Sequence, residues 1–164
     1  MRNLFAVCLC FSILVCSAQG RFAGSYRSLI GKKFFDEKQL TPLNNFTSRG
    51  GSVLGNPGGE ADLSVSWYSK GNLIVALYES RENSTKEITV IDVLEIKNVQ
   101  KNQELAMGVC TDGENEMPGL VALVQPSSAK RYKAIQAWNF NLDKIRIESW
   151  SADKVTCLGA VGED

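Results

Sequence analysis

The clearest pattern in the chain is an alternation of apolar and polar residues near its middle. Leu63, Val65 and Trp67 alternate with serine and tyrosine residues, and this period of two predicts a β-strand. A Ser-Lys-Gly-Asn turn follows at 69–72, and the run from Leu73 to Tyr78 is largely apolar. The two segments together predict a β-hairpin with a glycine-containing loop.

Short apolar segments separated by polar turns recur from there to the C-terminus. The polar stretch 79–86 predicts an exposed loop, and the β-branched residues between Ile88 and Ile96 predict a strand. The segment 132–140 fits a helix through spacings of three, but we favour a strand over 135–140 because a turn and an alternating segment follow it. We therefore expect seven or eight strands, in a mainly β domain built as an antiparallel sandwich or a small barrel. The remaining strands are expected at 104–110, 120–124, 144–150 and 154–158.

The segment before this β region has no regular period. Gly50-Gly51 and the Asn-Pro-Gly-Gly run at 56–59 interrupt it, and only 32–40 could form a short amphipathic helix. The glycines lack the spacing of a phosphate-binding loop. We expect residues 1–20 to be a cleaved signal peptide, 21–60 an irregular N-terminal segment packing on the domain, and 61–164 the antiparallel β domain.

The first twenty residues have the layout of a secretory signal. Arg2 precedes an apolar run from Leu4 to Val15, and small residues follow it. Two cleavage positions fit, after Ala18 and after Gly20. The apolar run has about 12 residues, whereas about 20 are needed to span a bilayer. We expect a secreted, extracellular protein without a membrane span.

The cysteines support the same compartment. Five are present, and three of them lie in the leader, so the mature chain keeps Cys110 and Cys157. A pair of cysteines in an oxidising compartment most simply forms a disulfide. Closing so long a loop removes about 4 kcal/mol of chain entropy from the unfolded state in the simple model.

Two sequons predict a glycoprotein. They are Asn45-Phe46-Thr47 and Asn83-Ser84-Thr85. We favour Asn83, because it lies in the polar stretch, over Asn45, whose apolar neighbours Leu43 and Phe46 are expected to be partly buried.

The chain contains no histidine. This excludes Ser-His-Asp and Cys-His catalysis and the usual zinc and copper ligand sets. Carboxylate chemistry is not excluded, because two acidic residues are enough for glycoside hydrolysis. Charge argues against a nucleic-acid partner, because only Arg2 of the 18 basic residues lies in the leader and the remainder nearly balances 18 acidic residues.

Aromatic residues are the remaining candidates for recognition. We name Trp150, Trp138 and Trp67 as possible ligand or partner contacts, with packing in the core as the alternative for each. The alternating acids at 112, 114 and 116 fail the EF-hand pattern and predict a solvated turn. No catalytic residue, metal site or cofactor is predicted.

These observations lead to one functional expectation and two alternatives. We expect a secreted, non-catalytic glycoprotein that acts as an extracellular binding or interaction module, whose partner is a protein, a glycan or a matrix surface. The first alternative is a carrier of a small apolar ligand in a β-barrel cavity. The second is a histidine-free hydrolase that acts through carboxylates.

Overall fold

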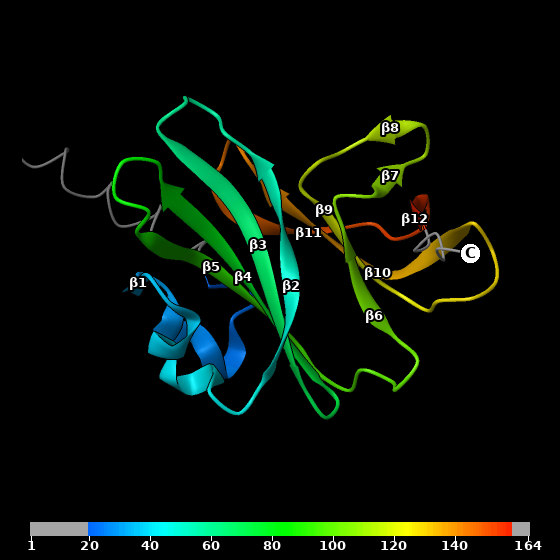
Figure 1. The fold of residues 1–164 in the computed structure, drawn as a ribbon. Coiled ribbons are helices and arrows are strands. Elements are labelled where there is room, and N and C mark those ends of the chain that lie inside the picture. Colours follow the sequence, from blue (N-terminus) through cyan, green and yellow to red (C-terminus); the bar gives the residue numbers. More distant parts are fainter. Residues whose placement is uncertain (1–19, 159–164) are drawn as a thin grey trace, which may run out of the picture.

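Two antiparallel β-sheets stacked face to face form the fold (Figure 1). The structure is a computed structural model in which residues 20–158 are described, so the predicted leader lies outside the described residues except for Gly20. The five-stranded sheet has the order β1-β5-β4-β3-β2. The seven-stranded sheet follows the path β6-β9-β10-β12-β7-β8, and β11 pairs with β10. The mainly β prediction is confirmed, and the sandwich is the alternative that forms.

The five-stranded sheet is a meander extended by the N-terminal segment. The predicted hairpin is its centre: β3 and β4 pair without interruption, and Gly71 at the turn between them has a φ of +59°. The strands are β1 (Lys33–Phe34), β2 (Thr47–Gly55), β3 (Ala61–Lys70), β4 (Leu73–Glu82) and β5 (Ile88–Ile96).

The seven-stranded sheet is organised around its longest strand, β10. The first residues of β10 pair with β12, while the rest of the strand lies between β9 and β11. The described residues contain twelve strands where seven or eight were expected, because β1, β2 and β8 were not expected and the strand expected at 104–110 is divided into β6 and β7. The strands of this sheet are β6 (Glu104–Met107), β7 (Cys110–Asp112), β8 (Asn115–Glu116), β9 (Leu120–Val124), β10 (Arg131–Asn141), β11 (Arg146–Trp150) and β12 (Val155–Leu158).

The space between the two sheets is filled by side chains. Tyr78 from β4 and Phe140 from β10 are fully buried there and meet edge to face at 5.4 Å between ring centroids. Val65 and Leu94 add β-branched and aliphatic surface from the five-stranded sheet. Burial of this kind contributes about 2 kcal/mol per large side chain, so the inner faces of the sheets supply most of the driving force for folding.

The outer face of the five-stranded sheet is partly covered by three short 3-10 helices. Leu29 and Leu40 from these turns are buried against Val75 and Val93 of the sheet. Figure 1 shows the turns in blue and cyan beside the first sheet. The turns are η1 (Gly24–Leu29), η2 (Glu37–Gln39) and η3 (Thr41–Leu43).

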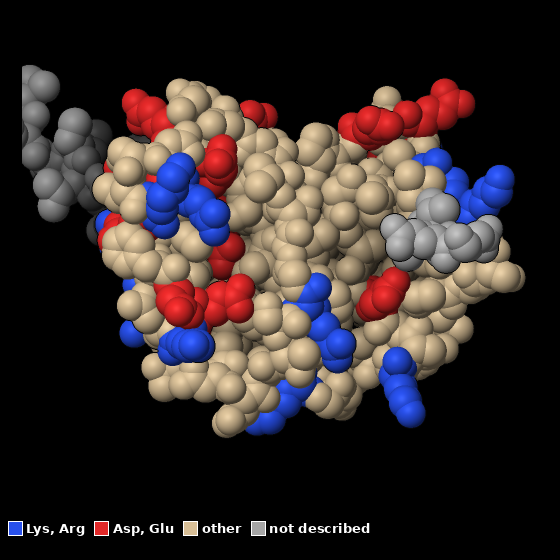
Figure 2. All heavy atoms as spheres, viewed as in Figure 1, with Lys and Arg blue, Asp and Glu red and all other residues tan. Residues whose placement is uncertain are grey.

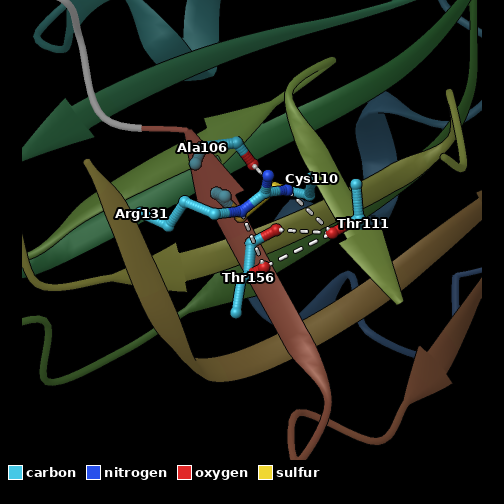
Figure 3. Close-up of a disulfide and its surroundings, with 6 residues drawn as sticks. Ala106, Cys110, Thr111, Arg131 and Thr156 are labelled. Atoms are coloured by element: carbon cyan, nitrogen blue, oxygen red, sulfur yellow. Dashed lines mark hydrogen bonds between the residues drawn. A yellow bond between two sulfur atoms is a disulfide. The ribbon is translucent and has the colours of Figure 1, made fainter. Parts of the chain in front are cut away.

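A disulfide between Cys110 and Cys157 joins β7 to β12 (Figure 3). The two cysteines are direct cross-strand neighbours, with Cα atoms 4.0 Å apart. Arg131 of β10 donates to hydroxyl groups on these two strands, to Thr111 of β7 at 3.0 Å and to Thr156 of β12 at 3.2 Å. The predicted pairing is confirmed, and it fixes the last strand to the sheet.

Some local expectations differ from the structure. β2 passes through Gly50-Gly51, where the sequence predicts a break, because a bulge accommodates both glycines. The segment 32–40 forms β1 and η2 and not one helix, since Asp36 caps a new turn there. β4 continues to Glu82, so the first part of the expected loop at 79–86 is strand.

Within residues 20–158, no helix combines the length and the apolar character that crossing a membrane requires.

Candidate functional site

A cavity of about 380 Å³ lies on the part of the outer face of the five-stranded sheet that the helices leave open. Its floor is made by β3 and β4. Phe34 of β1, with Phe35 and Glu37 just after it, forms one wall, and residues 50–53 of β2 form another. The cavity therefore lies where the covering turns end and the sheet continues.

The floor is polar because of the alternation in β3. Its inward residues Leu63 and Val65 join the core, so Asp62, Ser64 and Ser66 face the cavity. Across the strand pair, Asp62 lies opposite Arg81 and Ser64 lies opposite Glu79. The period that predicted the strand thus places a row of hydrogen-bonding groups along the cavity.

Glu79 is the central group of this floor. Glu79 is only 5 % exposed, and Ser66 Oγ donates a hydrogen bond of 2.7 Å to Glu79 Oε1. Burial raises the pKa of Glu79 to about 7, and the nearby Glu37 carboxylate raises it further, while Ser66 and Arg81 oppose these effects. A carboxyl group with this pKa can donate or accept a hydrogen bond near neutral pH.

Tyr68 lies at the base of the same cavity. Its hydroxyl is buried and has no hydrogen-bond partner among the residues that the structure describes. Burial is the main reason why the pKa of Tyr68 is raised, with Ser66, Glu79 and Glu37 as its polar neighbours. Leaving a buried hydroxyl without a partner costs about 1–3 kcal/mol, so a polar group that enters the cavity and bonds to it is favoured.

The mouth of the cavity is kept open by the bulge in β2. The pairing with β3 shifts between Ser48 and Gly51, and Gly50 has a φ of +98°, which favours glycine. A Cβ atom on Gly51 would clash with the carbonyl oxygen of Val65, whereas one on Gly50 would meet nothing within 4 Å. Gly51 therefore allows the close approach of the two strands, and neither glycine places a side chain over the cavity.

The rim adds an exposed aromatic ring to these polar groups. Phe35 is 64 % exposed, whereas its neighbour Phe34 is buried. In Figure 2, acidic and basic side chains are intermixed on this side of the molecule, over the helical turns and the first sheet. Hydroxyl, carboxyl and guanidinium groups under an aromatic rim suit a small ligand with many hydroxyl groups.

The three tryptophans named from the sequence lie elsewhere. Trp138 is buried in the core between the sheets, and Trp67 is half-buried against the same core. Trp150 packs partly on the cluster beside the disulfide, and its Nε1 donates to Asp112 Oδ2 at 3.2 Å. The structure does not bring the three rings together on one surface.

Both predicted glycosylation sites lie in turns. Asn45 is exposed, while its neighbours Leu43 and Phe46 are buried and half-buried, as expected. Asn83 is half-buried, and its Nδ2 donates to the Gly59 carbonyl at 3.2 Å. Accessibility in this structure favours Asn45, which is the reverse of the order expected from the sequence.

The described residues contain no cluster of three or more histidine, cysteine or acidic side chains that could hold a metal ion. Among the alternating acids that were compared with the EF-hand pattern, Asp112 accepts the hydrogen bond from Trp150, and Glu114 and Glu116 line a second cavity. That cavity, of about 580 Å³, lies beside the disulfide and reaches Leu158, the last described residue. Its acids are exposed, unlike Glu79, so it offers no buried polar group to a ligand.

Sequence reasoning missed Glu79, Tyr68 and Arg81 as a group. Tyr68 was part of the recognised alternation, but Glu79 and Arg81 stood in a polar stretch that predicted a loop. The usable signal was that Ser64, Ser66 and Tyr68 share a strand face, which makes that face polar beside an apolar hairpin partner.

Comparison with known proteins gives no match to a family model, to a curated protein or to a solved structure.

Proposed function

We propose that this chain is a secreted, non-catalytic binding protein whose β2–β4 cavity holds a small polyhydroxylated ligand, such as a sugar unit of a glycan. The observation that carries the proposal is the pair of buried polar groups, Glu79 and Tyr68, in one open cavity. Buried polar groups are normally satisfied inside the protein. Here a ligand hydroxyl can exchange hydrogen bonds with Glu79, and a small movement of the side chains in the cavity floor would bring the buried Tyr68 hydroxyl within its reach.

Secretion is part of the same proposal. The leader-like segment 1–20 and the two sequons motivate it, and the Cys110–Cys157 disulfide supports it because disulfides persist in oxidising compartments. Digestion of the secreted protein with an N-glycosidase is expected to lower its mass. An Asn45→Gln variant is expected to lose the larger part of that shift, and an unchanged mass in wild type would remove the glycoprotein proposal.

Binding is tested on an array of immobilised mono- and oligosaccharides, with the best saccharide then titrated by calorimetry. Glu79→Gln and Arg81→Gln are each expected to weaken its affinity by about tenfold, as expected for the loss of a hydrogen bond to a charged group. The matched control is Glu104→Gln, an exposed acid on β6 outside the cavity. No binding to any array member, or equal weakening in the control, would contradict the proposal.

A histidine-free hydrolase at the same cavity is the second candidate. The specific observation is that the pKa of Glu79 is raised to about 7 while Glu37 and Asp62 line the same cavity. One protonated and one ionised carboxyl group is the requirement for glycoside hydrolysis. Release of reducing ends from the bound saccharide, lost in Glu79→Gln, would support this candidate over pure binding.

An apolar-ligand carrier receives no comparable support. Tyr78, Phe140 and Leu94 occupy the space between the sheets, and the two cavities described above are open to the surface.

A further inference from the structure

The chain is integrated into the fold from its first described residue, Gly20. From there the N-terminal segment runs along the free edge of β5 (Figure 1). Glu95 N donates to the Phe22 carbonyl at 2.8 Å, and Val90 exchanges two backbone hydrogen bonds with the segment, one with Gly31 and one with Lys32. The segment therefore completes the sheet edge before β1 begins.

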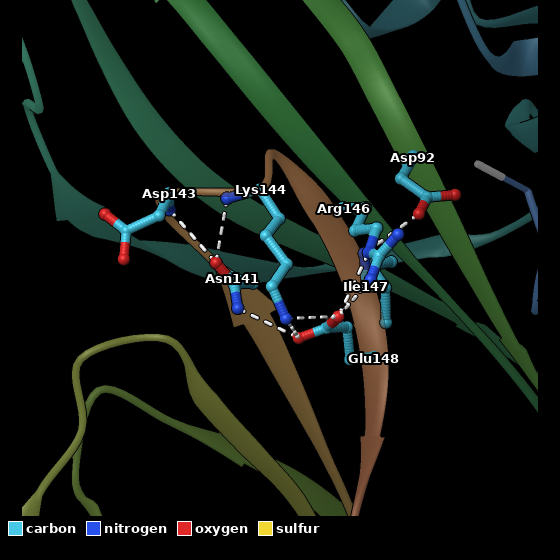
Figure 4. Close-up of polar contacts among 7 residues, drawn as sticks. All are labelled: Asp92, Asn141, Asp143, Lys144, Arg146, Ile147 and Glu148. Carbon is cyan, nitrogen blue, oxygen red and sulfur yellow. Dashed lines mark hydrogen bonds and ion pairs between the residues drawn. The ribbon is translucent and has the colours of Figure 1, made fainter. Parts of the chain in front are cut away.

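Asp92 of β5 holds the start of this segment. Asp92 is 1 % exposed, and its Oδ1 accepts hydrogen bonds from the backbone N–H of Gly20 at 2.7 Å and of Val93 at 2.9 Å. Its Oδ2 accepts from Ile147 N of β11 at 2.9 Å, which Figure 4 shows. One buried carboxyl group thus connects the N-terminal segment, the first sheet and the edge of the second.

The backbone conformation at Gly20 favours glycine. Its φ is +74°, and an added Cβ atom would lie 2.8 Å from Ile30 Cδ1. Its carbonyl accepts from Ala23 N at 3.2 Å and from Arg27 at 3.3 Å. Gly20 is therefore bonded on both its amide and its carbonyl side, as a residue of the folded domain is.

We propose that the precursor is cut between Ala18 and Gln19, so that Gly20 stays in the mature protein bound to Asp92. This rests on the proposed secretion. Hydrolysis adds one water across the Ala18–Gln19 bond and leaves a carboxylate on Ala18 and an ammonium on Gln19. Both positions satisfy the small-residue rule in the sequence, but cutting after Gly20 removes the donor from Asp92. A buried carboxylate that loses a partner is costly, so the structure discriminates between the two positions.

The test is the N-terminal peptide of the protein secreted by cells that express the whole precursor. Digestion with a glutamate-specific protease releases the peptide that ends at Glu37, and mass spectrometry reads its start. We expect it to begin at Gln19. Because an N-terminal glutamine can close to a lactam by losing ammonia, a peptide lighter by one ammonia counts as the same start and would escape Edman sequencing.

Two other results would overturn the inference in different ways. A peptide that begins at Arg21 contradicts the assigned bond but leaves secretion intact. A protein that begins at Met1 removes secretion, and the cleavage site with it.

Glycine substitutions test whether Gly20 is part of the fold without reference to cleavage. Gly20→Ala is compared with Gly31→Ala, because Gly31 has a similar φ of +81° but open space around its Cβ position. We expect Gly20→Ala to lower the Tm by roughly 2 °C more than the control does, because the atoms nearest to its added Cβ are the mobile ends of the Ile30 and Arg27 side chains. Equal Tm values would show that Gly20 is not packed in the mature protein, and would overturn the inference.

Discussion

The regions around Glu79 and Asp92 differ in how they bury a carboxyl group, although the two residues lie on neighbouring strands of one sheet. Pairing between β4 and β5 shifts where Tyr78 faces Asp92 and Glu79 faces Val90. Asp92 accepts three hydrogen bonds from backbone N–H groups, whereas Glu79 accepts one from the side chain of Ser66. Burial raises the pKa of Glu79 to about 7. The Asp92 region is internally satisfied, and the Glu79 region is the one that we propose binds a ligand.

The difference follows from what each carboxyl group faces. Asp92 faces backbone amides of β11 and of the N-terminal segment, and these rigid donors hold it in one position. Glu79 faces a cavity whose other groups are side chains. We infer that Asp92 serves the stability of the fold, while the Glu79 region trades stability for binding.

Replacing each buried carboxyl group, Asp92 and Glu79, with its amide tests this comparison most strongly, and the larger effect is expected at Asp92. Asp92→Asn replaces one acceptor oxygen with an NH₂ group that opposes a backbone donor, so we expect a loss of about 3 kcal/mol in the free energy of unfolding. Urea denaturation at pH 8 measures it. Asp143→Asn in the exposed turn after β10 is the control and should stay within about 0.5 kcal/mol of wild type. A loss as small as that of the control would mean that Asp92 is not a structural anchor.

The second prediction concerns the pH dependence that Glu79 imposes. Its pKa in the folded state, about 7, lies above its ordinary value of 4.5, so the folded state binds more protons between these values. The free energy of unfolding should therefore fall as pH rises from about 4.5 to 7 and then level off. The full difference is about 3 kcal/mol, and about 2 kcal/mol of it lies between pH 5 and pH 8.

Glu79→Gln provides the control for this profile. Glutamine cannot ionise, so the variant should lose most of the decline and be more stable than wild type at pH 8. If wild type and variant show parallel profiles in urea denaturation from pH 5 to pH 8, the buried carboxyl group is not the cause.

Opposite pH behaviour is expected of Glu148, which is also surrounded by partners. Arg146 donates to it at 2.6 Å, Lys144 and Asn141 add hydrogen bonds, and these contacts lower the pKa of Glu148 to about 2 (Figure 4). Its stabilising contribution is present above pH 4.5 and is lost as pH falls toward 2, so it leaves the pH 5–8 window to Glu79.

The features that could be predicted from the sequence are those set by local residues. The β3–β4 hairpin and the strand at Ile88–Ile96 could be predicted, because period and β-branched content are local properties. The Cys110–Cys157 pairing could be predicted because no other cysteine lies outside the predicted leader. Such features need no knowledge of distant contacts.

Features that depend on distant contacts could not be predicted. The Gly50-Gly51 pair looks like a break in the sequence, yet it forms a bulge because β3 lies beside it. Glu79 looks like the start of a loop, and its burial depends on the N-terminal turns that form the cavity wall. Asp92 was not singled out from the sequence either, although an acid flanked by apolar residues in a strand must be satisfied by partners that the sequence does not identify.

The smallest expected effect comes from removing the hydroxyl groups of two tyrosines, one in each region. Tyr68 belongs to the Glu79 region and its hydroxyl has no partner within residues 20–158, whereas Tyr78 lies opposite Asp92 and donates to the Asn141 carbonyl at 3.1 Å. Tyr78→Phe leaves a carbonyl without its donor and should cost about 1 kcal/mol. Tyr68→Phe removes an unsatisfied hydroxyl and should be neutral or stabilising by up to about 1 kcal/mol.

Urea denaturation of both variants, with saccharide titration of Tyr68→Phe, decides what the Tyr68 hydroxyl is for. If Tyr68→Phe gains stability and loses affinity, its hydroxyl is retained for the ligand at the expense of the fold. If it loses as much stability as Tyr78→Phe and binds normally, the hydroxyl has a structural partner such as a bound water. The Glu79 region would then be satisfied in the same way as the Asp92 region, and the contrast between them would reduce to the pKa of one carboxyl group.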